Sequence, residues 1–321
     1  MSYFNISDAD LKKSATTYRK ELLIMPVTAA EQTLKHMTGR PGVAGREAVG
    51  EISGSIEIGP YNATRVDDTG VNVTPRYLET WLGSVVKRFD VNDAAKTVYG
   101  SLIAQGKALE GAEIARQILD FLSAKLGASL NASIWSAKRN DSGTTTKDLF
   151  NGFDTITDTE VAAGSIAAGK GNFVQLTEAV SDTNARDILL NEVYRAAADE
   201  LQGVPTKLYV SRDIYNAYCE DYLKTFGAVA YNQQYKQTFL EGSDGLCELV
   251  PLTSKKGSQY IHLSTAGNML YGYGAGMADE NVAIERFHEF LLSYVATMYF
   301  GVQFQSVSPE ALFVAKLKAG E

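Results

Sequence analysis

The sequence predicts an α+β fold, because one long strand, one long amphipathic helix and a block that alternates helices and strands occur along the same chain. Every even-numbered position from Phe290 to Phe304 is apolar or aromatic, and a period of two places those side chains on one face of a strand. Apolar residues recur at steps of four from Ile114 to Ile134, which predicts a helix at about residues 108–136. A strand with one apolar face needs a second apolar element to cover it, so we expect this helix and strand to pack together.

The first predicted element in chain order is a helix at residues 8–24. Ser7 is placed to cap this helix, and Pro26 ends it. Its apolar stripe is narrow, so we expect the helix to pack on a surface outside itself. Residues 1–45 are therefore interpreted as an N-terminal arm.

Residues 46–90 predict a long β-hairpin with a polar tip. The sequence is glycine-rich and then alternates up to Gly59, and strand-like sequence returns from Val71 to Phe89. The polar stretch Pro60–Gly70 lies between the two arms. Apolar residues are few for this length, so we expect the hairpin to need a partner surface.

The second half of the chain predicts a compact α/β block. Residues 139–172 are turn-rich and polar, which indicates a loop or irregular sheet. Asn184 is placed to cap a helix that ends at Gly203, and Ser211 follows a short buried strand and caps a second helix. Two strands, LCELVPL and SQYIHLS, come next, and GNMLYGYGAG is expected to turn the chain towards the long strand.

Composition limits the function classes. At 321 residues, the chain is expected to form two subdomains that share a core. Its net charge of −8 argues against phosphate neutralisation as a way of binding nucleic acid, but not against enclosing it. Cys219 and Cys247 have no CxxC spacing. The N-terminus lacks the features of a secretory signal and no apolar run is long enough for a membrane span, so we expect a soluble protein made in the cytosol.

One glycine-rich stretch suggests an enzyme as a second hypothesis. Residues 164–171, GSIAAGKG, match the first seven positions of the phosphate loop GxxxxGK[ST]. Gly171 stands where the loop needs a hydroxyl to bind magnesium. A flexible glycine-rich loop is the alternative to a nucleotide-hydrolysing site.

The other chemical motifs are incomplete. YGYGAG at 271–276 lacks the spacing of a dinucleotide fingerprint and predicts a turn, and there is no GxSxG nucleophile motif. His288 begins an HExxH-like stretch, but Leu292 stands where the second zinc ligand belongs. We therefore expect no catalytic residue, no cofactor and no metal site.

Charged and histidine side chains are given structural interpretations. The carboxylate pairs Asp67-Asp68 and Glu220-Asp221 are interpreted as solvated charges on a hairpin tip and on a helix. The three histidines share no spacing, so each is interpreted as a surface or hydrogen-bonded residue.

The order of these parts resembles the major capsid proteins of tailed bacteriophages, the Hong Kong ninety-seven fold that encapsulin nanocompartments share. The similar stretches are PGVAGREAVGEI, YGSLIAQGKALEG, PTKLYVSRDIYNAY and YFGVQFQSVSPEALFVAKL. The resemblance covers nearly the whole chain, and it depends on the order and spacing of these stretches. It implies an N-terminal arm, an extended loop, a peripheral domain with a long spine helix, and an axial domain, at residues 1–45, 46–90, 91–180 with 280–305, and 181–279 with 306–321.

The resemblance implies a major capsid protein that self-assembles into the hexamers and pentamers of an icosahedral shell. Such a shell is assembled in the cytoplasm of the bacterial host, becomes part of the virion, and encloses double-stranded DNA without sequence-specific binding. Scaffold, portal and decoration proteins are the implied partners, with no membrane contact, and an encapsulin-type shell is the alternative. The loop-tip residues expected to act in assembly are Pro60, Tyr61, Asn62, Arg65, Asp67 and Asp68.

Two departures from the family follow from the sequence. Some members join their subunits by isopeptide bonds from a lysine on the extended loop, but this chain has no lysine between Lys35 and Lys87. We therefore predict a shell without covalent cross-links. Some members also begin with a long scaffolding segment, and the arm predicted here is too short for one, so a separate scaffold protein is expected.

Overall fold

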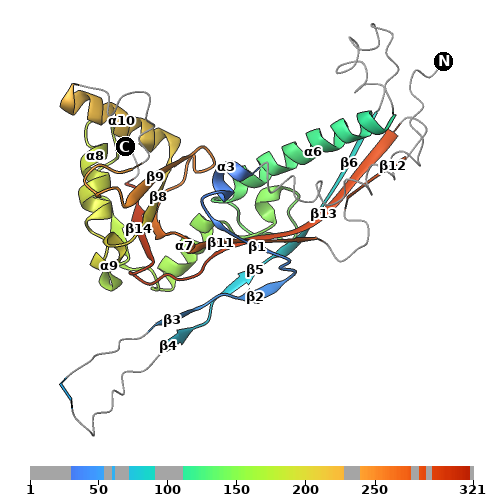
Figure 1. Ribbon diagram of the computed structural model, residues 1–321. Helices are drawn as coiled ribbons and strands as arrows, with labels where there is room; N and C mark the ends of the chain where they lie inside the picture. Colours follow the sequence, from blue (N-terminus) through green and yellow to red (C-terminus); the bar gives the residue numbers. More distant parts are fainter. Residues whose placement is uncertain are drawn as a thin grey trace.

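The computed structural model describes residues 30–53, 60–61, 72–90, 111–227, 239–275, 282–286 and 291–318. Two five-stranded sheets carry the fold in these residues, and helices pack on both (Figure 1). None of the described helices has the length and apolar character needed to cross a lipid bilayer. The helix predicted at 8–24 lies outside the described residues.

The first sheet is built around the long strand β13. Strands β1, β11, β13 and β12 follow one another across it, and β6 pairs along β13 as well. The bounds are Thr38–Pro41 for β1, Trp81–Asp90 for β6, Met269–Ala275 for β11, Val282–Arg286 for β12 and Leu291–Phe304 for β13. Tyr294, Phe300 and Phe304 are buried on the even-numbered face, which confirms the predicted strand.

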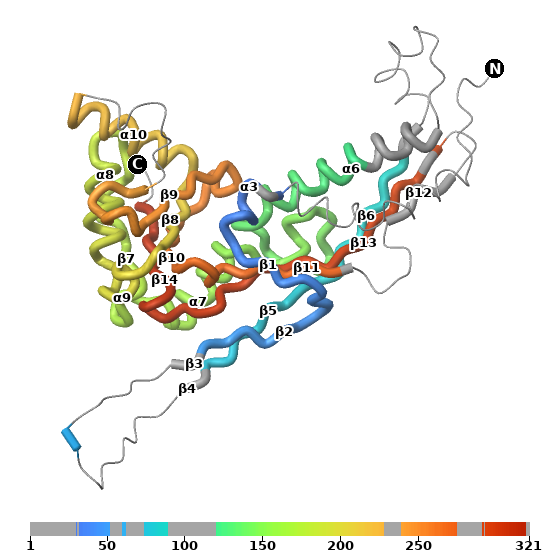
Figure 2. Tube along the Cα trace, in the orientation of Figure 1, coloured from blue at the N-terminus to red at the C-terminus, as the bar shows by residue number. Residues whose placement is uncertain are grey.

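The long helix α6, Gly111–Ser133, runs beside this sheet (Figures 1 and 2). Its buried residue Leu130 and the following Ile134 and Trp135 share one core with Phe300. The predicted packing of the helix against the long strand is therefore confirmed for these described side chains.

The second sheet has the order β7-β14-β10-β8-β9. The bounds are Phe173–Gln175 for β7, Thr206–Ser211 for β8, Cys247–Leu252 for β9, Tyr260–Thr265 for β10 and Leu312–Lys316 for β14. Successive residues of a strand point to opposite faces, so Leu208 faces the helices of this sheet while Tyr209 faces the core of the first sheet. The second sheet thus lies between the two cores and joins them.

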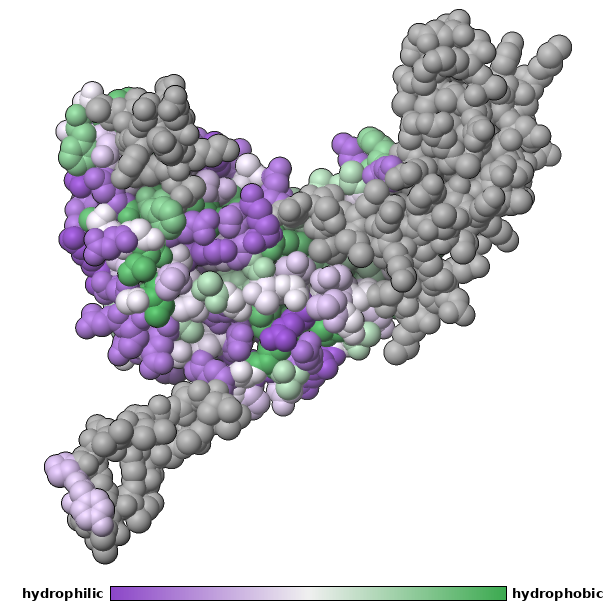
Figure 3. Space-filling view, in the orientation of Figure 1, coloured by the Kyte–Doolittle hydropathy of each residue, from purple (hydrophilic) through white to green (hydrophobic). Residues whose placement is uncertain are grey.

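Helices α8 (Ala185–Asp187), α9 (Asp199–Gln202) and α10 (Arg212–Phe226) cover the second sheet, with a π-helical segment at Ile188–Tyr194. Hydrophilic residues cover most of this lobe on the face drawn in Figure 3. Ser211 caps α10 as predicted, because its hydroxyl accepts a hydrogen bond from the backbone N–H of Ile214 at 3.3 Å.

The single helix predicted from Asn184 is interrupted, and its capping prediction is wrong. The Asn184 side chain accepts from the backbone N–H of Ser181 at 2.8 Å. The backbone N–H of Arg186 donates instead to a carboxylate oxygen of Asp221 in α10, at 2.8 Å. Asp221 is 4% exposed, so the prediction that it is a solvated charge is also wrong. A carboxylate near the start of a helix replaces water as the acceptor for its free N–H groups.

The polar region 139–172 contains a helix that the sequence analysis missed. This helix is α7, Phe153–Ala162, and its buried residues are Phe153, Ile156 and Thr157. A short 3-10 turn at Ala168–Lys170 follows, and β7 comes after it. The stretch 164–171 therefore lies between a helix and a strand, whereas a phosphate loop lies between a strand and a helix.

A two-part hairpin leaves the first sheet. Strands β2 (Arg46–Ala48) and β5 (Tyr77–Glu79) form its base, and β3 (Glu51–Ser53) and β4 (Asn72–Thr74) continue it. Both pairs are antiparallel, which confirms the hairpin for these residues. Figure 2 shows β3 and β4 pointing away from both sheets.

Strand pairing joins segments that the sequence analysis assigned to different parts of the chain. β1 of the expected arm, β6 of the expected loop and β11 of the expected axial domain all belong to the first sheet, and β7 of the expected peripheral domain belongs to the second. Residues 271–275 of YGYGAG thus belong to strand β11, although this motif was predicted to be a turn. Pairing between distant segments leaves no local signature in the sequence, which explains why this strand was missed. The division into domains remains a proposal with these changes.

Candidate functional site

The root of the hairpin, where β5 and the following Thr80 cross the first sheet, lies over two glycines. Gly272 of β11 and Gly301 of β13 face each other in the strand register. A Cβ atom added at Gly301 would lie 2.0 Å from the carbonyl oxygen of Glu79, and one added at Gly272 would lie 2.7 Å from Cγ2 of Thr80. No side chain fits in this gap. Gly272 of YGYGAG and Gly301 therefore serve a close approach between the hairpin root and the sheet.

Thr80 fastens the two arms of the hairpin together. This residue is 3% exposed, and its hydroxyl donates to the carbonyl oxygen of Val43 at 3.0 Å. The backbone N–H of Gly45 donates to the same hydroxyl at 3.0 Å, and the N–H of Thr80 donates to the Gly45 carbonyl at 2.7 Å. Beneath these bonds lies a small apolar cluster of Val43, Val49, Leu78 and Leu270.

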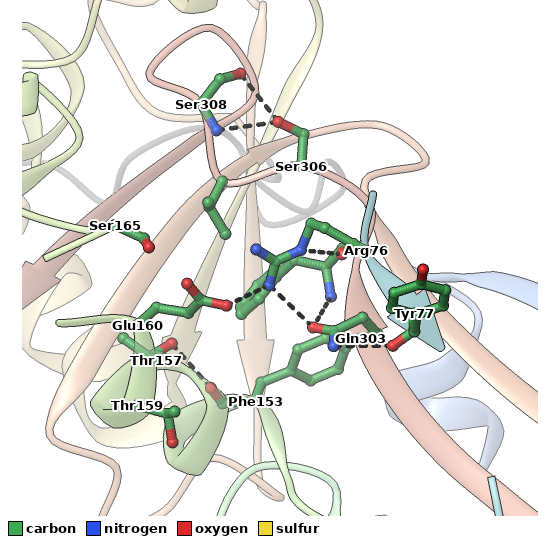
Figure 4. Close-up of polar contacts among 12 residues, drawn as sticks. Arg76, Tyr77, Phe153, Thr157, Thr159, Glu160, Ser165, Gln303, Ser306 and Ser308 are labelled. Carbon is green, nitrogen blue, oxygen red and sulfur yellow. Dashed lines mark hydrogen bonds and ion pairs between the residues drawn. The ribbon is translucent and has the colours of Figure 1, made fainter. Parts of the chain in front are cut away.

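Arg76 ties the hairpin to two further elements (Figure 4). Its guanidinium forms an ion pair with Glu160 of α7 at 2.6 Å and donates through Nε to the backbone carbonyl of Phe304 in β13 at 3.1 Å. Gln303 lies beside it and donates to the carbonyl oxygen of Tyr77 at 3.2 Å. The Arg76 and Glu160 side chains are only 11% and 19% exposed, so water screens this pair weakly.

The outer surface of the root is more open. The Arg46 guanidinium lies 3.5 Å above the Tyr77 ring and 3.5 Å from a carboxylate oxygen of Glu79. Arg46 and Glu79 are 58% and 48% exposed, and such pairs contribute little to stability. A cavity of about 300 Å³ opens beside them, between the hairpin base, α7 and β13.

Of the six predicted assembly residues, the structure describes Pro60 and Tyr61. Both are exposed, and the Tyr61 side chain is 95% exposed. Asn62, Arg65, Asp67 and Asp68 lie outside the described residues. An aromatic side chain with nearly all of its surface in water is a candidate for contact with another molecule.

Part of the predicted hairpin packs on its own chain. Leu78 is fully buried, and all of β6 pairs with β13. The partner surface expected for residues 46–90 is therefore supplied in part by the same chain. The sequence analysis missed Arg76, Thr80 and Glu160; the one available signal was the presence of glycines inside strand-like sequence.

The described histidines, His36 and His262, do not belong to a cluster able to bind a metal ion. The part of the chain that the structure describes holds no cluster of three or more His, Cys, Asp or Glu side chains able to bind a metal ion. Burial, followed by the charges of Lys207 and Lys35, lowers the pKa of His36 to about 4. His36 is therefore neutral at pH 7, and its 3.9 Å approach to Glu248 is not an ion pair there.

Comparison with known proteins identifies the fold. No family model and no curated protein sequence matches the chain. Among solved structures, the chain is similar to one from the capsid of an empty GTA particle, with 14% identity, 90% of each chain covered and a TM-score of 0.57. It is also similar to a chain in the procapsid of satellite phage P4 that includes the size determination (Sid) protein, with 12% identity, 90% and 96% coverage and a TM-score of 0.53. A Gordonia phage Cozz chain matches with 14% identity, 93% and 87% coverage and a TM-score of 0.50.

These similarities span about nine-tenths of the chain. The architecture is therefore the α+β fold of phage-type capsid chains, the Hong Kong ninety-seven-like fold expected from the order of the sequence elements. Sequence identities this low show the fold alone.

Proposed function

We propose that this chain is the major capsid protein of a tailed bacteriophage and that it self-assembles into a closed shell. The observation that carries the proposal is the hairpin. Its root is held by Arg76, Thr80 and two glycines, while β3 and β4 point away from both sheets and Tyr61 is 95% exposed. A rigidly rooted arm that carries an exposed aromatic side chain is suited to contacts with other copies of the chain.

The proposal has finer parts, which rest on the family resemblance. Hexamers and pentamers form an icosahedral shell, the shell is assembled in the host cytoplasm, and it encloses double-stranded DNA in the virion. Scaffold, portal and decoration proteins are the proposed partners. The net charge of −8 suits this role, because an acidic wall does not hold a polyanion tightly. Catalysis has no part in the proposal.

Electron microscopy of the purified, overexpressed chain tests self-assembly. We expect closed particles of uniform size. A monodisperse monomer at high protein concentration, measured by light scattering, would contradict the proposal.

A deletion variant tests the role of the hairpin. Ser53 and Asn72 are paired across β3 and β4, so an Asn-Gly turn that replaces residues 54–71 closes the hairpin without changing its base. We expect a folded chain with an unchanged circular dichroism spectrum that forms no particles. Normal particles from this variant would show that the hairpin is not needed for assembly, and they would leave the proposal of self-assembly unaffected.

The contents of native particles distinguish the two shell types. Particles from the source that encodes the chain are expected to contain nuclease-protected double-stranded DNA. Protein cargo without nucleic acid would favour the encapsulin-type alternative.

A further inference from the structure

A buried lysine lies at the junction of the two sheets. Lys255 is 1% exposed, in the turn between β9 and β10. Its Nζ lies 2.9 Å from Nδ1 of His262, 3.1 Å from the hydroxyl of Ser258 and 3.4 Å from a carboxylate oxygen of Asp154. The same ammonium lies 3.7 Å from the ring centroid of Trp135. A lysine this deeply buried is unusual without a specific set of partners.

These partners come from both halves of the molecule. Lys255 and His262 belong to the second sheet and its turn, whereas Asp154 lies in the first turn of α7 and Trp135 follows α6. The neighbouring Ser254 also contacts the other half of the molecule, since the Trp135 indole N–H donates to its hydroxyl at 3.2 Å. We name the contact between Lys255 and His262 the clasp.

The hydrogen bonds define which nitrogen of His262 carries the proton. An ammonium can only donate, so Nδ1 of His262 accepts from Lys255. Nε2 then carries the hydrogen and donates to the hydroxyl of Thr157 at 2.9 Å, and Thr157 donates onward to the carbonyl oxygen of Phe153 at 2.8 Å. The chain of donors and acceptors is complete only while His262 is neutral.

A second proton on His262 has no place in this arrangement. His262 is fully buried, and an N–H at Nδ1 would point at the Lys255 ammonium. The nearby carboxylates among the described residues have other partners. Asp154 contacts Lys255, and Asp158 of α7 accepts a hydrogen bond from the hydroxyl of Tyr260 at 2.6 Å. The aromatic neighbours Trp135, Tyr260 and Phe304 pack around the ring with centroids 5.4–6.1 Å away.

We propose that the clasp is proton-sensitive: neutral His262 holds the turn at residues 253–258 against α7 and Trp135, and a proton on His262 releases it. Burial, followed by the charge of Lys255, holds the pKa of His262 well below its ordinary value of 6.5. A group with a lowered pKa in the closed state stabilises that state at neutral pH and loses this contribution as the pH falls. The release is therefore an acid response, and it does not depend on whether the chain forms a shell.

Trp135 reports on the clasp. The chain has two tryptophans, so Trp81→Phe leaves Trp135 as the only indole fluorophore. We expect its emission, and the hydrogen exchange of amides in residues 253–258, to change in one transition below pH 6.5. His262→Gln, in the same background, is expected to abolish the transition. Lys255→Met is expected to move the midpoint upward, because it removes the neighbouring positive charge.

The matched control is His36→Gln, which removes the other described histidine with a lowered pKa and should leave the transition in place. An unchanged transition in His262→Gln, or an unchanged midpoint in Lys255→Met, would overturn the proposal. Should either variant fail to fold, the exchange of the His262 imidazole C2 hydrogen in the unaltered chain, followed by mass spectrometry, gives its pKa directly. A value of 6.5 or above would also overturn the clasp.

Discussion

The carbonyl oxygen of Glu79 occupies the position where any residue other than glycine at position 301 would place its Cβ, because a Cβ built on Gly301 comes within 2.0 Å of that oxygen. The crossing of β5 over β13 is thus a contact between two backbones. The direction in which the hairpin leaves the molecule depends on it.

Gly301→Ala is therefore expected to destabilise the chain by about 3 kcal/mol, because the backbone of β5 must move. Gly169→Ala is the matched control, since no atom lies within 4 Å of its added Cβ. The free energy of unfolding of the unassembled chain in urea measures both. Equal effects of the two substitutions would show that the backbones of β5 and β13 do not approach each other this closely in solution.

Arg76→Ala is expected to cost about 2 kcal/mol, because it removes a charge-assisted hydrogen bond and leaves Glu160, 19% exposed, without this partner. Arg46→Ala removes an exposed arginine from the same root and is expected to cost less than about 1 kcal/mol. Urea unfolding compares the two variants. A larger loss for Arg46→Ala would contradict the assignment of Arg76 as the anchor.

Alkaline pH is expected to stabilise the chain through Lys255. Burial lowers the pKa of this lysine from 10.5 to about 8, against the opposing effect of Asp154. Between these two values the unfolded chain binds a proton that the folded chain does not, so the free energy of unfolding rises with pH, by about 1.4 kcal/mol per pH unit at most. The difference between the unaltered chain and Lys255→Met, measured from pH 8 to pH 10, isolates this contribution. A difference that is constant with pH would contradict it.

Denaturing electrophoresis of assembled particles is expected to show a single band at the 34.8 kDa of the chain. The physical reason is the absence of a lysine between Lys35 and Lys87, which leaves the expected loop tip, residues 60–70, without an amine nucleophile. Heat-treated and reduced samples serve as controls for incomplete dissociation. A ladder of covalent oligomers that survives both treatments would contradict the prediction.

Nucleotide titration tests the enzyme hypothesis. We expect no magnesium-dependent binding, because residues 164–171 follow helix α7 and precede strand β7, the reverse of the order in a phosphate loop. Calorimetry with a nucleoside triphosphate and magnesium measures this. Binding that is lost in Lys170→Ala would restore the hypothesis.

The sequence alone determined the elements whose apolar period or capping residue lies within the element itself. The alternation from Phe290 to Phe304 predicted β13, and the four-residue spacing that ends at Ile134 predicted the long helix, because burial on one face imposes a period on each. The cap at Ser211 was predicted for the same reason, since a hydroxyl beside the first turn acts within a few residues.

Only the tertiary structure decided which segments meet. The pairing of β1 with β11, the capping of α8 by Asp221 and the ion pair between Arg76 and Glu160 join residues from 35 to more than 200 positions apart. Such contacts impose no period on the sequence between them. A glycine in a strand and a carboxylate in a helix look alike in the sequence whether they face water or another backbone, and the fold alone distinguishes the two cases.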